Sequence, residues 1–274
     1  MNSPAEILPG VIFYSYLSAK RKEKVCLWNH HTLILQVSGT LVLETSAHQI
    51  AIDGGQLLLI GRNQLGVLKK TPVPGGNYET IVISLQEDLL RRIALEERLD
   101  AELKYPGAPN VLIPTNEFLQ GYFQSIIPYA RNSGSAMTDE LGILKVKELV
   151  KLLLLAMPEL RSFLFDFSEP HKLDLQKLMF HNFHYNIPIE QFAELSGRSL
   201  SAFKRDFVKM FGAPPRQWLQ DRRLLEARHI LITKEAKLSA IYLDLGFESL
   251  AHFSRSFKKK FGVTPSEYLS TQRP

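Results

Sequence analysis

The sequence is poor in cysteine and has no long apolar run. Cys26 is the one cysteine among 274 residues, which excludes an internal disulfide and leaves no thiolate cluster for zinc or an iron–sulfur centre. The longest apolar run, residues 152–157, is far too short to cross a bilayer, and the N-terminus lacks the basic-then-apolar layout of a signal peptide. We therefore expect a cytoplasmic protein without a membrane partner.

Low-complexity segments and blocks of like charge are also absent, so we expect a chain that is ordered nearly throughout and long enough for two domains. Residues 1–170 hold 16 Lys and Arg against 18 Asp and Glu, a net charge of −2, whereas residues 171–274 hold 17 against 10, a net charge of +7. A basic second domain favours a polyanionic partner, although a solubilising surface would carry the same charge.

Residues 10–85 have the pattern of short strands separated by turns. Runs rich in β-formers at 32–37 and 40–45 flank the turn dipeptide Ser38-Gly39, and further glycine-rich turns follow at regular spacing. This pattern predicts a small sandwich or barrel.

Helical periodicity begins after residue 85. We predict helices over about 86–104, 115–130 and 138–157, with Thr115 as the cap of the second. The third helix carries two apolar stripes and only a narrow polar strip, so it needs partners on two sides. Those partners belong either to its own domain or to a second copy of the chain, and periodicity favours neither.

The strongest signal is an internal repeat in the basic part of the chain. The segment SLSAFKRDF at 199–207 recurs as SLAHFSRSF at 249–257. The correspondence continues without a gap: Phe211-Gly212 matches Phe261-Gly262, Pro215 matches Pro265, and Trp218-Leu219 matches Tyr268-Leu269.

Each copy has the layout helix, tight turn, helix. A short amphipathic segment is followed by a glycine that permits the turn, Gly197 or Gly246, and then by a serine placed to cap the second helix, Ser199 or Ser249. Phenylalanines at spacings of four should form a buried stripe along each second helix. We predict helix-turn-helix units over about 187–212 and 238–262.

The helix period then places polar and basic residues on the outer face of each second helix. These residues are Ser201, Lys204, Arg205 and Val208 in the first copy, and Ala251, His252, Arg255, Lys258 and Lys259 in the second. Such faces suit a helix that enters a DNA groove, because Arg and Lys donate to guanine edges or neutralise phosphates. A solvated charged face is the alternative for any single helix, but two matching helices in a basic domain favour DNA.

A continuous helix is predicted between the two units, over about 214–232, with Pro215 in its first turn. It would span ~27 Å, somewhat less than the ~34 Å between successive major-groove faces of B-DNA, and could hold both second helices on one side of the duplex. Arg223 in this helix and Lys259 lie nearer the helix flanks, and we expect them to contact phosphates.

The C-terminal residues resemble the AraC/XylS-type bacterial transcription regulators. The resemblance rests on LGFES at 245–249, FSRSFK at 253–258 and FGVTPSEY at 261–268, and it covers roughly residues 171–270. It implies two helix-turn-helix subdomains joined by a linker helix. It also implies base contacts from Ser201, Lys204, Arg205, Leu250, Ala251, His252 and Arg255. Tyr242 departs from the family, which usually has alanine there, and this affects the expected local packing.

The resemblance further implies an α+β protein in which a cupin-like small β-barrel and dimerising helices precede the all-α DNA-binding domain. We expect a sensor and dimerisation domain over residues 1–168 and the DNA-binding domain over 169–274. The expected partners are double-stranded DNA, RNA polymerase and a second copy of the chain, and the expected action is activation. A small-molecule effector or a regulatory protein would act on the N-terminal domain.

No catalytic, cofactor or metal site is predicted. His30, His31 and His48 lack the His-x-His pattern with a following glutamate that a metal-binding cupin would show, and no base is identifiable for Cys26. Three classes of function stay open: a ligand-responsive activator, an activator controlled by a partner protein, and, as a distant third, an enzyme with an appended DNA-binding domain.

Overall fold

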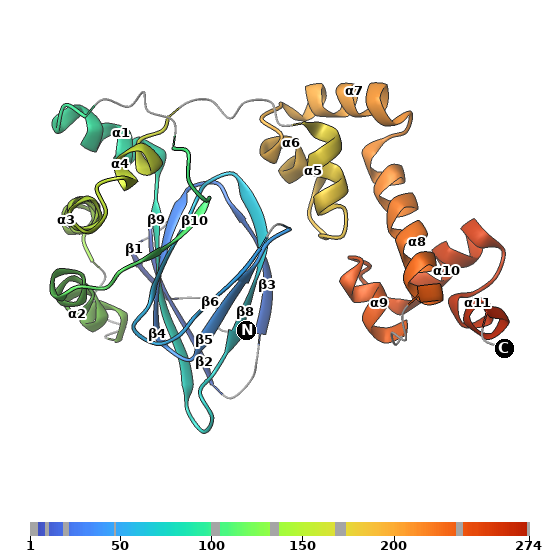
Figure 1. The fold of residues 1–274 in the computed structure, drawn as a ribbon, viewed down its shortest axis with the longest axis horizontal. Coiled ribbons are helices and arrows are strands. Elements are labelled where there is room, and N and C mark those ends of the chain that lie inside the picture. The colour runs from blue at the N-terminus through green and yellow to red at the C-terminus, as the bar shows by residue number, and fades with distance from the viewer. Residues whose placement is uncertain are drawn as a thin grey trace. The chain divides into compact units, whose positions relative to one another are not determined.

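The computed structural model describes residues 5–8, 11–18, 22–46, 48–99, 105–131, 137–167, 174–233 and 238–272. The chain divides into two compact units, Met1–Glu169 and Pro170–Pro274 (Figure 1).

The first unit contains two antiparallel sheets. The larger has the strand order β1-β2-β9-β4-β7-β10, and the smaller β3-β8-β5-β6. The strands are β1 (Ala5–Leu8), β2 (Ile12–Ser18), β3 (Lys22–Trp28), β4 (His31–Ser38), β5 (Thr40–Glu44), β6 (Gln49–Ile52), β7 (Leu57–Ile60), β8 (Gln64–Thr71), β9 (Asn77–Leu85) and β10 (Asn110–Ile113). Among the described residues the two sheets share no strand pairing, so they form an open sandwich, which is one of the two arrangements that the strand pattern predicts. The cupin-like barrel that the resemblance implies is not closed here.

Both faces of the larger sheet are buried, which explains the uninterrupted apolar runs of its central strands. On β4, Leu33 and Leu35 belong to the core beneath the helices, whereas Ile34 between them belongs to the core between the two sheets. The strand β7 alternates in the same way. Since successive side chains of a strand point to opposite faces, the larger sheet lies between the helices and the smaller sheet.

In the described residues of the first unit, four helices cover one side of the larger sheet (Figure 1). They are α1 (Glu87–Glu96), α2 (Glu117–Arg131), α3 (Asp139–Ala156) and α4 (Leu160–Leu164). Helix α1 ends earlier than predicted, and residues 100–104 lie outside the described residues. The cap of α2 is Asn116 and not Thr115, because the Asn116 side chain accepts from the Leu119 amide at 2.9 Å.

Helix α3 is buried on one side only. Val146, Leu149, Val150 and Leu153 are fully buried, whereas Leu144 and Leu155 are 61% and 65% exposed. Its close approach to β1 depends on Gly142, where an added Cβ would lie 2.3 Å from the Leu8 side chain. The second apolar stripe, with Val146, Val150 and Leu154, therefore packs against the core of this unit. The two exposed leucines lie on the side that also carries the exposed Glu148 and Lys151.

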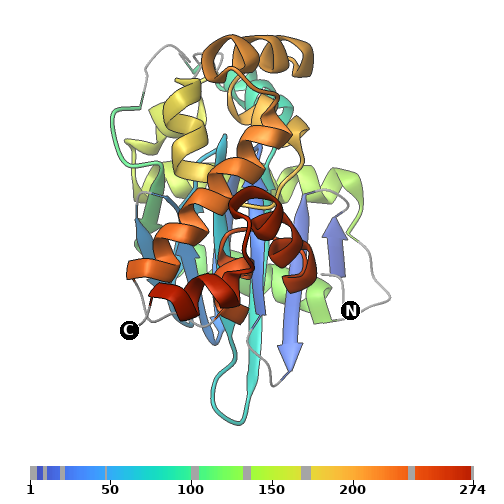
Figure 2. The same ribbon diagram turned by 90° about the vertical axis from the view of Figure 1, so that its right-hand side faces the viewer.

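The second unit is helical: α5 (Leu175–Asn182), α6 (Ile189–Leu195), α7 (Leu200–Phe211), α8 (Pro215–Thr233), α9 (Leu238–Asp244), α10 (Leu250–Phe261) and α11 (Pro265–Gln272). Helix α8 runs through it, with α5 to α7 at one end and α9 to α11 at the other (Figures 1 and 2). We name α6 and α7 the first HTH unit and α9 and α10 the second. Across the described parts of both units, no helix is both long enough and apolar enough to cross a membrane.

Candidate nucleic-acid interface

The second helices of the two HTH units, α7 and α10, begin and end in the same way. Ser199 accepts a hydrogen bond from the Ala202 amide at 3.3 Å, and Ser249 accepts one from the His252 amide at 3.2 Å. Each helix is followed by a left-handed glycine, Gly212 or Gly262. The predicted serine caps are confirmed, and we call α7 and α10 the recognition helices.

The phenylalanine stripe of each recognition helix faces inward. Phe203, Phe207, Phe253 and Phe257 are fully buried, and Phe211 and Phe261 pack against the same core. The Phe207 ring lies 5.7 Å from the Trp218 ring, and the Phe257 ring lies 5.7 Å from that of Tyr268. The aromatic correspondence between the repeats is therefore a correspondence of packing. Tyr242, the departure from the family pattern, also packs against this core.

The opposite faces of the recognition helices are exposed. The exposed residues are Ser201, Lys204, Arg205 and Val208 on α7, and Leu250, Ala251, His252, Arg255, Lys258 and Lys259 on α10. The Arg205 side chain is 78% exposed and lies 3.6 Å from Asp206, a carboxylate that is closer to Arg198, at 3.3 Å. Within the described residues, Lys204, Arg255 and Lys259 form no ion pair. Because exposed ion pairs contribute little, these cations are available to a polyanion.

Both HTH units are attached to α8. Trp218 of α8 packs on Phe211 of the first HTH unit, with ring centroids 4.7 Å apart. Gln220 donates to Ser256 of the second HTH unit at 3.0 Å, and Lys260 of α10 forms an ion pair with Asp221 of α8. Lys260 is therefore occupied within the protein, unlike its neighbour Lys259.

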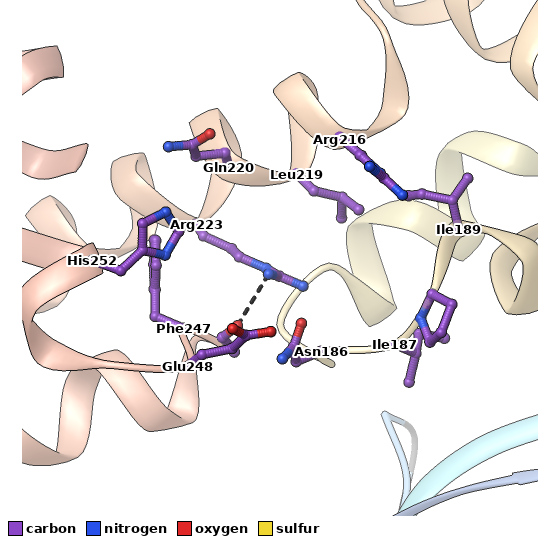
Figure 3. A pocket seen from close by; sticks show the side chains of 12 residues that line it. Asn186, Ile187, Ile189, Arg216, Leu219, Gln220, Arg223, Phe247, Glu248 and His252 are labelled. Carbon is purple, nitrogen blue, oxygen red and sulfur yellow. Dashed lines mark hydrogen bonds between the residues drawn. The ribbon is translucent and has the colours of Figure 1, made fainter. Parts of the chain in front are cut away.

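A pocket of about 510 Å³ lies between the two HTH units beside α8 (Figure 3). It is lined by Arg216 and Gln220 of α8, by Asn186 before the first HTH unit and Ile189 within it, and by Glu248 and His252 of the second HTH unit. Arg216 also lines a second hollow together with Lys204 and Val208 of α7. Arg216 is thus the cation of α8 that lies between the outer faces of the two recognition helices.

Arg223 has a different position from the one expected of a phosphate contact. Its Nε donates to the Phe183 carbonyl at 2.7 Å, its Nη2 to the Tyr185 carbonyl at 2.8 Å, and its Nη1 to the Gly246 carbonyl at 3.1 Å. Burial lowers the pKa of its guanidinium to about 10, so the group stays charged at neutral pH. Three of its N–H donors are therefore used within the protein, and the expected phosphate contact of Arg223 stays a prediction.

A signal for this inward orientation is present in the sequence. Arg223 lies four residues after Leu219 and four before Ala227, and both of these are buried. Residues four apart share one face of a helix, so Arg223 belongs to the buried stripe of α8.

The histidines of the first unit are held by ordinary packing. His31 is 7% exposed, its ring lies 4.7 Å from that of Phe163, and burial and the nearby Arg62 lower its pKa to about 3. His48 Nε2 lies 2.8 Å from Asn110 Nδ2. In the part of the chain that the structure describes, no group of three or more His, Cys, Asp or Glu could hold a metal ion.

Comparison with known proteins gives two family matches. Residues 192–271 match the helix-turn-helix domain model, and residues 31–164 match the ExsA N-terminal regulatory domain model. The transcriptional regulator ExsA of Pseudomonas aeruginosa is 32% identical over 109 residues, which are 39% of this chain and 39% of ExsA. The thermoregulatory protein LcrF of Yersinia pestis is 26% identical over 239 residues, which are 82% of this chain and 83% of LcrF.

Among solved structures, an apo ToxT variant of Vibrio cholerae aligns with 96% of this chain and 98% of its own, at 13% identity and a TM-score of 0.45. The two family models match the two units in the order in which they occur along the chain. The chain belongs to the AraC/XylS family of DNA-binding transcription regulators, a family of regulators and not of enzymes.

Proposed function

We propose that this protein is a sequence-specific activator that inserts α7 and α10 into successive major grooves of one duplex. The observation that carries the proposal is the pair of equivalent helices, each with a buried aromatic stripe and an exposed polar face, in two HTH units that are both attached to α8. At 1.5 Å per residue, the 19 residues of α8 span about 28 Å, which is close to one turn of B-DNA.

The side chains divide into base and backbone contacts. We assign base contacts to the exposed residues of the two recognition helices: Ser201, Lys204, Arg205, Leu250, Ala251, His252 and Arg255. Lys259 is assigned to phosphate, and we assign Arg216 there in preference to Arg223, because Arg216 lines the two hollows beside the recognition helices. Hydroxyl-radical footprinting with the full chain tests the insertion of both helices: two protected stretches for each bound copy, about one helical turn apart on one side of the duplex, are expected. A single short protected stretch would contradict it.

Activation is proposed because the relatives include a protein of Yersinia enterocolitica named as the virulence regulon transcriptional activator VirF, which is 33% identical over 73 residues. We expect this chain, bound upstream of a promoter, to raise the yield of transcripts by RNA polymerase. Transcription in vitro measures the effect, on a template that carries a binding site selected by the protein from random DNA (the selected site). A template with a scrambled site is the control. A lower yield from the intact site would make the protein a repressor.

The first unit is proposed as the dimerisation domain, with the outer side of α3 as the interface. Leu144 and Leu155 are eleven residues apart, about three helical turns, so the two exposed leucines lie on one side of α3. We expect the full chain to have twice its monomer mass in light scattering at tens of micromolar. The double variant Leu144→Asp, Leu155→Asp should have the monomer mass, because it would bury four carboxylates in the interface. The control is Val73→Asp, at an exposed turn. An unchanged mass in the double variant would place the interface elsewhere.

The regulatory signal is proposed to come from a partner protein at the surface of the first unit. The space between the two sheets is filled by buried apolar side chains, among them Trp28, Leu43 and Leu58. A small effector bound there would have to displace this core. The proposal is tested by thermal shift of the full chain against a library of small metabolites: stabilisation by one of them would favour a ligand-responsive regulator.

A further inference from the structure

Arg223 binds two parts of the second unit that are far apart in the sequence. Phe183 and Tyr185, whose carbonyls it binds, lie in the segment that leads into the first HTH unit. Gly246, the third acceptor, is the turn glycine of the second HTH unit. Figure 3 shows the guanidinium reaching from α8 across the pocket to this junction. One side chain therefore connects α8 to the segment before the first HTH unit and to the second HTH unit.

The turn of the second HTH unit also closely approaches the segment before the first HTH unit at this point. Gly246 has a φ of +73°, and a Cβ added to it would lie 2.5 Å from the His184 carbonyl oxygen and 3.2 Å from the Arg223 Cζ. Glycine is therefore required for conformation and for space. The turn of the second HTH unit lies against the segment before the first HTH unit, and Arg223 lies beside both.

The chemistry of the guanidinium makes this junction directional. Its donors lie in one plane and in a fixed fork, so three carbonyls can be bound together only in one relative arrangement. Within the described residues no carboxylate pairs with Arg223, and this half-buried charge is stabilised by these hydrogen bonds. A shift of the second HTH unit relative to the segment before the first would break part of this set of bonds to a half-buried charge. The junction therefore resists both translation and rotation of one HTH unit relative to the other.

We propose that Arg223 is a positioning residue that sets the spacing of the DNA sites this protein accepts. Because it fixes the second HTH unit to the segment before the first HTH unit, Arg223 fixes the separation and the relative rotation of the two recognition helices. The inference rests on the proposed function, in which both helices bind one duplex. One inserted base pair moves the second half-site by ~3.4 Å and rotates it by about 35°, and a rigid pair of helices cannot follow both changes.

The test uses the full chain and three duplexes: the selected site, and the same site with one base pair inserted or deleted between its two contacted segments. The test variant is Arg223→Lys, which keeps the charge but loses the planar fork. The control is Arg228→Lys, another arginine of α8, which is exposed and lies over the Phe261 ring. We expect a change of spacing to weaken the wild type and the control by roughly 30-fold, and Arg223→Lys by less than about 5-fold. Circular dichroism confirms that each variant is folded.

The spacing ratio is the affinity for the selected site divided by the affinity for a duplex with one base pair inserted or deleted. Equal spacing ratios in folded Arg223→Lys and the wild type would overturn the proposal, even if the variant bound every duplex more weakly. A merely structural role for Arg223 would give this result. A wild type without any sequence preference would instead contradict the proposed function. If Arg223→Lys does not fold, Gly246→Ala perturbs the same junction from the other side and should also lower the spacing ratios.

Spin labels at Lys209→Cys and Lys258→Cys, in a Cys26→Ser background, test the proposal independently and without DNA. The distance distribution between them should be narrow in the wild type, and a broad one would overturn the proposal.

Discussion

Replacing Phe207 with alanine should destabilise the second unit by about 3–5 kcal/mol, the usual cost of removing a fully buried phenylalanine. The Phe207 ring contacts those of Phe203, Phe211 and Trp218, at centroid distances of 5.5, 4.4 and 5.7 Å. Its removal leaves a cavity where α7 meets α8. We expect the first HTH unit to lose its fixed position, and sequence-specific binding to fall with it.

Chemical denaturation followed by Trp218 fluorescence measures this loss. The other tryptophan, Trp28, belongs to the first unit, so the experiment is done in a Trp28→Phe background. The control is Met210→Ala, because Met210 lies on the same helix and is 51% exposed. It should change stability by about 0.5 kcal/mol or less. A loss below about 1 kcal/mol for Phe207→Ala would contradict the role of the phenylalanine stripe as the core of the unit.

Replacing Arg205 or Arg255 with alanine should cost ~1–3 kcal/mol of binding to the preferred site and relax discrimination at one or two base pairs. The two arginines occupy equivalent positions in the repeat and are exposed, and Arg255 forms no ion pair within the described residues. Lys259→Ala provides the contrast. Since Lys259 is assigned to phosphate, its loss should weaken binding to all sequences alike and lower the salt slope by about one unit.

Binding profiles over a library of single-base variants of the site measure these effects for each protein. For Arg205, the alternative role is the ion pair with Asp206, but Asp206 is closer to Arg198, and an exposed pair of this kind contributes little. If both arginine variants keep the wild-type specificity profile, they are phosphate contacts, and the assignment of base reading to them is wrong.

The second unit could be predicted from the sequence because its determinants are local. The serine caps, the turn glycines Gly197 and Gly246 and the phenylalanine spacing each fix a conformation within one or two helical turns. The linker helix begins at Pro215, as its sequence predicts. A repeat doubles the weight of each signal, because the same residues must serve the same purpose twice.

The first unit depends on contacts between distant residues, and there local patterns fail. The strands β1 and β10 lie outside the predicted strand region, and they exist as strands because β1 pairs with β2 and β10 pairs with β7. Two open sheets and a closed barrel have the same alternation along each strand, so the sequence does not distinguish them. For Arg223, the spacing from Leu219 and Ala227 indicates the inward orientation, but its three carbonyl partners come together only in the folded unit.

Selection of binding sites from random DNA by the full chain tests the central claim most directly. Two recognition helices held at the ends of α8 predict an enriched site with two conserved segments, separated by about one turn of the duplex and bound by one copy of the second unit. Enrichment of one short segment, or of no sequence at all, would contradict the claim that both helices read one duplex.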